Sequence, residues 1–325
     1  DRIASLTEKK NSLQGQLNVS TQSIQSPVAG YFVSQADGLE DVVDYDKALS
    51  LTTEEVNAAL NAAPKAVDDA TVGKVVGDYE WYLACVLSAQ EAGSEEALAA
   101  LGLTPPPDAA GQLARYGSLL LEQNQVMNLT AITEPDQVVD LHFLDCAALL
   151  TLGVDFRDKS LIDVGTGAGF PGLPLKILEP SLRLTLLDSL GKRVRWLENV
   201  CEALSLDNVA CLHARAEEQA LAEGFRDGFD LVTSRAVAAL PLLCELCLPY
   251  VKVGGLFLAM KSVDSGEELN QAGRAIAKLG GRLLPPVDYE IPGCGVRHRV
   301  VRVEKLSPTP KGYPRRWAKI QKAPL

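Results

Sequence analysis

Three glycines spaced two residues apart are the strongest chemical signal in this sequence. Gly165, Gly167 and Gly169 follow the apolar run 161–164, in the stretch DVGTGAGFPG. A glycine-rich turn after a first strand lets a cofactor approach the backbone and the amides of the next helix. A dinucleotide site requires glycine at the sixth position of G-x-G-x-x-G, where this sequence has Phe170. The pattern therefore favours S-adenosylmethionine (SAM), which has no pyrophosphate, and an NAD-dependent dehydrogenase is the alternative.

Candidate ligand contacts lie at the ends of the next three predicted strands. Asp188 ends the second strand, Ala216 and Glu217 follow the third, and Arg235 follows the fourth. The carboxyl ends of parallel strands meet at one edge of a sheet, where ligands bind. Asp188 is placed to accept hydrogen bonds from both ribose hydroxyls, and Ala216 and Glu217 to contact adenine. The alternatives are a surface aspartate and a glutamate that favours a helix start.

The elements that must position these residues alternate between strand and helix. Such alternation predicts a parallel sheet with helices on both faces. Strands are predicted at 161–164, 182–187, 209–212, 229–233, 256–260 and 296–303, and helices at 173–178, 192–204, 216–222, 240–248 and 267–279.

Two further helices are predicted before the sheet, one from Asp108 and one over residues 135–150. His142 and Asp145 lie three residues apart on the second helix and therefore share a face. They resemble an acid–base pair, but a role in packing these helices onto the sheet is equally compatible with the spacing.

The composition is that of a globular protein of about two domains, with 325 residues, 47% of them hydrophobic. No run predicts a membrane span, and the first residues do not read as a signal peptide. The seven cysteines are odd in number and mostly lie in apolar runs, which favours buried thiols in a reducing cytosol. Cys244-x-x-Cys247 lacks a second ligand pair, so no metal is expected.

The charge of the chain is unevenly distributed. The net charge is −11, yet residues 297–325 carry nine basic residues and one acidic residue, a local net charge of +8. Local charge decides where a polyanion docks, so this basic tail predicts RNA binding, with a solvated tail as the alternative. Arg235, Arg315 and Arg316 are the candidate RNA contacts.

The first part of the chain has a different character. Residues 1–88 read as the end of an amphipathic helix followed by short strands, including SPVAGYFV at 26–33 and the runs at 72–76 and 81–87. This segment resembles a fragment of an HlyD-like membrane-fusion adaptor, and an unrelated small β-rich extension is the alternative. Residues 89–107 are predicted to be a linker that ends in three prolines.

From residue 108 to 325 the sequence resembles the RsmG (GidB) family of 16S rRNA guanine-N7 methyltransferases. The resemblance rests on collinear motifs: NLTAI at 128–132, HFLD at 142–145, the glycine stretch at 163–172, LDS at 187–189, RAE at 215–217, SRA at 234–236, and YPRR at 313–316. Two positions depart from the family pattern. Ser262 follows Lys261 where glycine is common, and Cys146 follows Asp145 where serine is common.

The resemblance implies a Rossmann-like class I SAM-dependent methyltransferase with N-terminal helices, preceded by a small β-containing segment. It implies cofactor contacts at the positions of Gly165, Phe170, Ala216, Glu217 and Arg235. The substrate would be 16S rRNA or the small ribosomal subunit, and we expect a cytoplasmic monomer. Guanine N7 carries a lone pair and no proton, so no general base is expected and no catalytic residue is assigned. The site has instead to align the reacting atoms and hold the base out of its stack.

Overall fold

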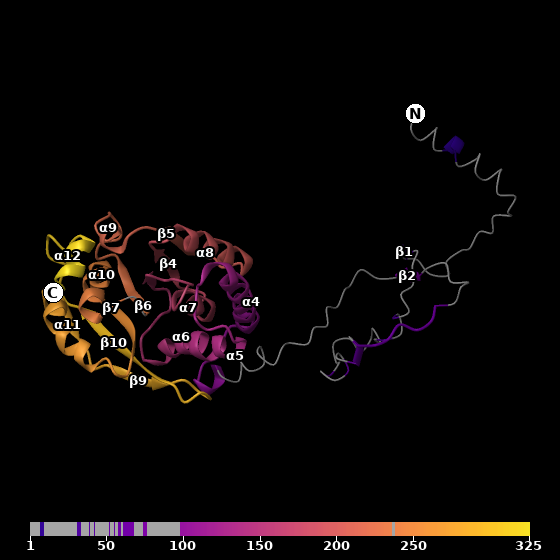
Figure 1. Cartoon of the computed structure of the whole chain (residues 1–325), viewed down its shortest axis with the longest axis horizontal. Helices are drawn as coiled ribbons and strands as arrows, with labels where there is room; N and C mark the ends of the chain where they lie inside the picture. Colours follow the sequence, from indigo (N-terminus) through magenta and orange to yellow (C-terminus); the bar gives the residue numbers. More distant parts are fainter. Residues whose placement is uncertain are drawn as a thin grey trace. The chain divides into compact units, whose positions relative to one another are not determined.

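The computed structural model describes residues 98–235 and 238–325, together with short pieces of the chain before residue 98. The chain divides into two compact units, Asp1–Val86 and Leu87–Leu325. In the first unit, β1 (Tyr31–Val33) pairs antiparallel with β2 (Lys74–Val76), where the sequence predicts strands (Figure 1). Most of the adaptor-like segment, including its predicted strand at 81–87, lies outside the described residues.

The second unit contains a sheet with the strand order β5-β4-β3-β6-β7-β10-β8, and β9 pairs with β10. Five strands run parallel: β3 (Ser160–Val164), β4 (Arg183–Asp188), β5 (Val209–His213), β6 (Phe229–Arg235) and β7 (Val251–Ser262). The chain adds β4 and β5 on one side of β3 and then crosses to β6 and β7 on the other. The topological switch point, where ligands bind in open α/β sheets, therefore lies beside the carboxyl end of β3.

The last strand differs from the prediction of an all-parallel sheet. β10 (Arg297–Lys305) runs antiparallel to β7, to β8 (Gly281–Leu283) and to β9 (Val287–Glu290). The segment 291–296 joins β9 to β10 and is too short for the crossover that a parallel pair requires. β8 and β9 were not predicted from the sequence. The expectation of a parallel strand at 296–303 was therefore wrong in direction, although a strand is present.

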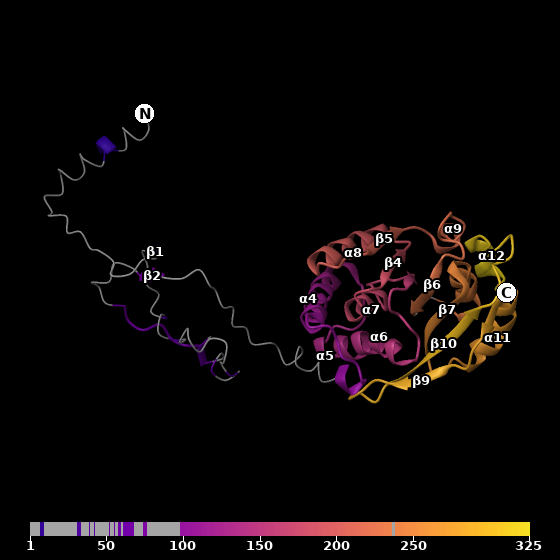
Figure 2. The same cartoon turned by 180° about the vertical axis from the view of Figure 1, so that it is seen from behind.

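The alternation of side chains along the strands divides the core into two halves. Successive residues of a strand point to opposite faces of a sheet. Leu161 belongs to the core that α4, α6, α7 and α8 cover, whereas Ile162 belongs to the core that α10 and α11 cover. Figures 1 and 2 show the two groups of helices on either side of the sheet. Those covering helices are α4 (Ala109–Met127), α6 (Asp145–Ala147), α7 (Gly172–Leu178), α8 (Gly191–Ala203), α10 (Leu240–Cys247) and α11 (Gly266–Lys278).

The predicted helix at 135–150 is present but irregular. It begins as α5 (Pro135–Val138), continues as the π-helical turn η2 (Val139–Leu144), and then passes through α6 into the 3₁₀ turn η3 (Ala148–Thr151). His142 lies in the π-helical turn, and such turns are frequent at functional sites.

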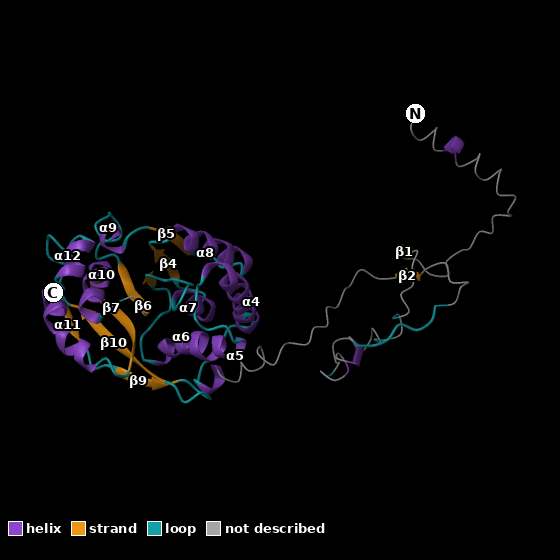
Figure 3. Ribbon diagram, viewed as in Figure 1, coloured by secondary structure: helices purple, strands orange, loops and turns teal. Residues whose placement is uncertain are grey.

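Short helices follow β5 and β10. α9 (Ala216–Gln219) begins just beyond β5, and α12 (Trp317–Lys322) ends the chain, as Figure 3 shows. The sequence analysis did not predict α12. Its one buried residue, Ile320, joins the core on the α10 side and holds the basic tail against the sheet domain.

Candidate active site

The glycine turn lies at the end of β3, at the switch point of the sheet. Gly165, Gly167 and Gly169 have φ values of +71°, +62° and +100°, which side chains with a Cβ rarely adopt. The amides of Gly165 and Thr166 both donate to the carbonyl oxygen of Leu187, at 2.9 and 3.0 Å. A Cβ on Gly167 would meet only the carbonyl oxygen of Gly165 at 4.0 Å, so open space lies above that residue.

Gly169 has a different role from the other two glycines. A Cβ there would lie 2.6 Å from Leu173 and 2.7 Å from the hydroxyl of Tyr116. Tyr116, fully buried on α4, donates a hydrogen bond to the carbonyl oxygen of Ala168. Gly169 is therefore needed for close packing under the turn, and it does not line the cavities described below.

Asp163 holds the turn from below. Its Oδ2 accepts hydrogen bonds from the Thr166 hydroxyl at 2.6 Å and the Gly172 amide at 3.1 Å, and its Oδ1 accepts one from the Thr233 hydroxyl at 3.1 Å. Complete burial raises the pKa of Asp163 to about 6, although these hydrogen bonds oppose the shift. Asp163 is thus a positioning residue to which the sequence analysis gave no role. The sequence feature that could have revealed this role is the position of an acidic residue within an apolar strand.

Asp188 ends β4 beside the glycine turn. Its side chain is buried, and its two oxygens accept hydrogen bonds from the amides of Gly167 at 3.0 Å and Leu190 at 2.8 Å. A guanidinium nitrogen of Arg193 lies 3.6 Å away. Two accepted bonds leave part of the acceptor capacity of a carboxylate unused. Asp188 lines both cavities of the glycine turn, so its free acceptor sites can serve a ligand.

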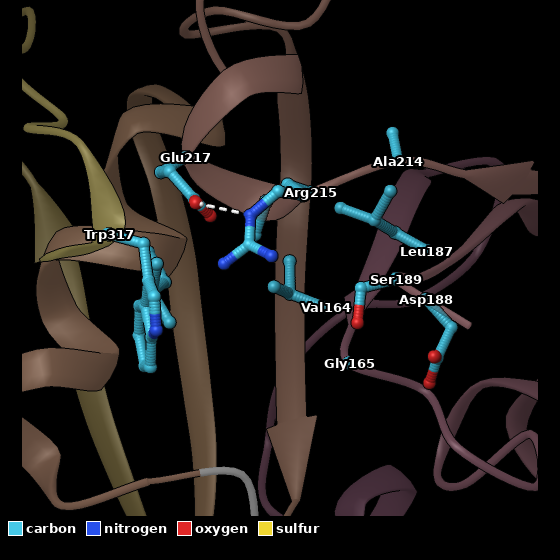
Figure 4. Close-up of a pocket in the computed structure, with 11 residues that line it drawn as sticks. Val164, Gly165, Leu187, Asp188, Ser189, Ala214, Arg215, Glu217 and Trp317 are labelled. Carbon is cyan, nitrogen blue, oxygen red and sulfur yellow. Dashed lines mark hydrogen bonds and ion pairs between the residues drawn. The ribbon is translucent and has the colours of Figure 1, made fainter.

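A first cavity extends from Asp188 toward the ends of β5 and α10 (Figure 4). Glu217 lies at its upper side, where its buried carboxylate accepts a hydrogen bond of 2.7 Å from Arg215 Nε. Trp317 of α12 forms the opposite side, a contribution that sequence reasoning missed. Apolar walls and an indole at the side suit a flat heteroaromatic ring. The walls are completed by Val164, Leu187, Ala214, Ala216 and Leu246.

A second cavity continues from the glycine turn toward Arg235. Phe170 is its aromatic wall, with the His142 ring stacked at 4.4 Å between centroids and the Arg235 guanidinium 4.7 Å from the Phe170 centroid. Arg235 Nη2 lies 3.0 Å from His142 Nδ1. Nδ1 also lies 3.1 Å from the Leu141 carbonyl oxygen, which can only accept, but the Arg235 nitrogen is closer and can only donate. We therefore assign the proton of His142 to Nε2, which then donates to the Thr130 hydroxyl at 2.8 Å. Burial, with the nearby Arg235 charge, lowers the pKa of His142 to about 4.

Asp145 is the shared hydrogen-bond acceptor of a polar cluster beneath Arg235. Its Oδ2 accepts a hydrogen bond of 3.2 Å from Arg235, and its Oδ1 accepts from the Tyr289 hydroxyl at 2.5 Å and from His298 Nδ1 at 2.7 Å. Burial alone would raise the pKa of Asp145, but these hydrogen bonds and the Arg235 charge outweigh it and lower the pKa. The His142 side chain contacts β6 through Arg235, and the Asp145 side chain contacts β6, β9 and β10. Both residues also line a third cavity, so the packing role and the substrate-facing role both stay open.

The predicted RNA contacts fall in two different environments. Arg315 lies against α10, and its Nε and Nη2 donate to the fully buried carboxylate of Glu245 at 2.7 and 2.6 Å. Arg316 is exposed, and no partner is seen for its side chain within the described part of the chain. Arg235 is mostly enclosed between the second and third cavities. Only Arg316 of the three is therefore displayed on the surface.

The cysteines and helices of the described residues bear on two further predictions, a metal site and a membrane span. Cys244 and Cys247 are buried free thiols on α10, and residues 98–235 and 238–325 contain no group of three His, Cys, Asp or Glu side chains arranged to hold a metal ion. Cys85 lies outside the described residues. Among the helices that the structure describes, none has the length and apolar character needed to span a bilayer.

The strand order, the glycine turn with Phe170 after it, and Asp188 define a SAM-dependent methyltransferase of the Rossmann-like class. Residues 109–289 match the model of the family described as GidB, rRNA small subunit methyltransferase G. The chain belongs to this family, as the resemblance of residues 108–325 implied.

Three relatives carry the name ribosomal RNA small subunit methyltransferase G. That of Clostridium tetani is 44% identical over 211 residues, 65% of this chain and 88% of the relative. That of Clostridium perfringens strain SM101 is 46% identical over 210 residues, again 65% and 88%. That of Lachnoclostridium phytofermentans is 45% identical over 230 residues, 71% of this chain and 95% of the relative. The alternative of an NAD-dependent dehydrogenase is therefore set aside.

Proposed function

We propose that this protein transfers the methyl group of SAM to N7 of a guanosine in 16S ribosomal RNA. The observation that carries the proposal is the meeting of two cavities at Arg235 and His142, one on the glycine turn and one beyond it, in a member of the rRNA small subunit methyltransferase G family. One cavity suits the cofactor and the other suits a base turned out of its stack.

The residues present fit SAM along its whole length. Gly165, Gly167 and Phe170 would hold the amino-acid end, because the turn has open space above Gly167. Asp188 would accept hydrogen bonds from the ribose hydroxyls with its remaining acceptor sites. Ala216 and Glu217 would contact adenine. We expect Trp317 to cover one side of the ring, because it lines the same cavity. Gly169 would act indirectly, by allowing Tyr116 to support the turn.

The chemistry requires alignment rather than proton transfer. SAM supplies an activated methyl group, which the N7 lone pair takes while the electron pair of the broken C–S bond stays on sulfur. The charge that leaves the sulfur appears on the guanine ring. Arg235 and His142 line both cavities and both contact the Phe170 ring, so they would orient cofactor and base toward each other. A fixed approach of this kind contributes a large part of a rate enhancement.

RNA would be bound by the exposed part of the basic tail. Arg297, Lys311, Arg316 and Lys319 are exposed, and no side-chain hydrogen bond or ion pair is seen for them among residues 98–235 and 238–325. Arg316 and Lys319 flank Trp317 at the first cavity, and Arg297 follows Val296, which lines the third. RNA phosphates bound beside the first cavity and beside the third cavity would position the RNA across the site that lies between them. The substrate is 16S rRNA or the small subunit particle.

We also propose that the protein acts in the cytoplasm as a monomer, without a metal ion. The part from 108 to 325 would be the enzyme, residues 89–107 a linker, and residues 1–88 a separate extension that resembles an HlyD-like adaptor fragment. Ribosome maturation in the bacterial cytoplasm supports the location.

Mass spectrometry of 16S rRNA nucleosides tests the function. The protein is incubated with 16S rRNA or with 30S particles and SAM that carries a labelled methyl group. We expect labelled 7-methylguanosine. Label on another nucleoside, or none on either substrate, would refute the proposal.

A further inference from the structure

The third cavity lies beyond Arg235 and is a candidate for the guanine site. It shares Arg235 and His142 with the second cavity, so a base placed in it would lie next to the cofactor site. Its walls are largely apolar, as the faces of a flat base require. The apolar lining residues are Ile132, Leu141, Met260 and Val296.

Most polar groups of this cavity are already engaged. Lys261 Nζ donates to the carbonyl oxygen of Ala238 at 2.7 Å and lies 2.8 Å from Glu268 Oε2. The terminal nitrogens of Arg235 bind Asp145, His142 and the Leu141 carbonyl oxygen. These groups shape the cavity but have little donor capacity left for a ligand.

The exceptions are the Ser262 hydroxyl, for which no hydrogen bond is seen within the described residues, and the ring of His298. Its Nδ1 lies 2.7 Å from Asp145 Oδ1, so this nitrogen carries a proton and donates to the carboxylate. The side chain is 30% exposed, and no hydrogen bond of Nε2 is seen within the described residues. The ring is thus held at Nδ1 by a buried carboxylate, and the side chain lines the cavity with the hydrogen-bonding capacity of Nε2 unused within the described residues.

The surroundings of His298 favour its protonated form. The hydrogen bond with Asp145 raises the pKa of His298, against the effects of burial and of the Arg235 charge. The titratable or charged groups around it are Asp145 on α6, Tyr289 on β9, Lys261 on β7, Arg235 on β6 and His142 on η2. In the protonated ring both nitrogens are donors.

We propose that the target guanine lies in the third cavity and that His298 Nε2 donates a hydrogen bond to its O6, which makes His298 a base-selecting residue. The proposal rests on the proposed function. The edge of guanine that carries N7 also carries the acceptor O6, whereas adenine has an amino group there. A donor on O6 selects guanine, leaves the N7 lone pair free, and fixes N7 beside the donor.

The first test compares His298→Ala with Tyr289→Phe. The control removes a hydrogen bond to the same Asp145 oxygen, but Tyr289 does not line the third cavity. With full-length protein and 16S rRNA we expect kcat/KM to fall about 10- to 100-fold in His298→Ala, the effect of losing a charged hydrogen bond, and a few-fold at most in the control. SAM affinity, measured by calorimetry, should stay within about twofold in both. A loss of SAM binding in His298→Ala would indicate a structural role and overturn the proposal.

The second test distinguishes a base-selecting role of His298 from a purely structural role. Wild-type kcat/KM should fall as the pH rises through the pKa of His298, since the Nε2 proton is lost, and this limb should be absent in His298→Ala. His298→Gln retains a donor, so it should recover part of the rate without the pH limb, and it replaces the alanine variant if that one does not fold.

The third test uses the base itself. Once the methylated guanosine is mapped, 2-aminopurine, which keeps N7 but lacks O6, is placed there by ligation. Combined with His298→Ala it should lower kcat/KM no further than either change alone, because both remove the same contact. If the two losses multiply, or if His298→Ala retains wild-type kcat/KM, His298 does not read O6. Absence of 7-methylguanosine with wild-type protein would instead refute the proposed function.

Discussion

Arg315 and Glu245, which lie seventy residues apart in the chain, form a bidentate ion pair beneath the basic tail. The guanidinium donates to both carboxylate oxygens at 2.7 and 2.6 Å, and the Arg315 amide donates to one of them at 2.9 Å. Glu245 is completely buried. The pair therefore fixes the segment before α12, and with it Trp317, to the sheet domain.

Arg315→Ala should destabilise the fold. Removing one partner of a buried pair leaves an uncompensated charge, and the typical cost is about 3–5 kcal/mol. Chemical denaturation of Arg315→Ala beside Arg316→Ala measures it, because Arg316 is the exposed neighbour. We expect a large loss only in the first variant. Equal stability of the two would mean that the pair does not anchor the tail.

Asp188→Ala should weaken SAM binding by about 1–3 kcal/mol, the scale of a lost hydrogen bond to a charged group. Since Asp188 also accepts from the amides of Gly167 and Leu190, the variant loosens the turn as well. Asp188→Asn keeps one acceptor oxygen and should bind with intermediate affinity. Calorimetry with SAM, with melting temperatures measured in parallel, distinguishes the two effects. Unchanged affinity in the alanine variant would refute the ribose assignment.

Charge reversal of Arg316 and Lys319 should weaken RNA binding. Each lost phosphate contact lowers the slope of log affinity against log salt by about 0.7–0.9. The matched control reverses Arg157 and Arg183, which are exposed at the amino-terminal edge of the parallel strands, away from the site. Filter binding across a salt series should show a reduced slope only for the tail variant. If both double variants reduced the slope equally, the tail would contribute only general charge attraction to RNA affinity.

His142 should make the protein less stable in acid. Its pKa in the folded protein is about 4, below the ordinary value of 6.5, so the unfolded chain binds a proton first as the pH falls. The lost stability between pH 6.5 and 4 is about 2–3 kcal/mol, and none of it is lost at pH 7.5. Denaturation of wild type and His142→Asn at several pH values measures it, and His213→Asn removes an exposed histidine as the control. An identical pH dependence in wild type and His142→Asn would contradict the prediction.

Residues 1–88 should be dispensable for methylation. The family match begins at residue 109, and the site residues all lie beyond residue 128. A chain that starts at Ser88 should retain SAM affinity and turnover on 16S rRNA within about twofold, an expectation that follows from the separate unit at Asp1–Val86. A collapse of either quantity would show that the extension is an integrated part of the enzyme.

Local patterns in the sequence were enough to predict the parallel strands and the cofactor turn. An apolar run followed by Gly165 and Gly167, or by Asp188, predicts both the strand and its functional end, because the residues involved are neighbours in the chain. The doubly wound topology then brings those strand ends to one edge. The irregular π-helical turn around His142 and the strands β8 and β9 were not predictable in this way, since they are short and lack clear periodicity.

The contacts that complete the site depend on the tertiary structure. The antiparallel insertion of β10 brings His298 to Asp145, and the return of α12 brings Trp317 to the cavity beside Leu187. The sequence by itself determined the class of cofactor and the residues at the strand ends, because neighbouring residues encode them. Only the fold decided that Arg315 is an anchor while Arg316 is exposed, because two adjacent arginines differ only in the distant partner that packing places beside one of them.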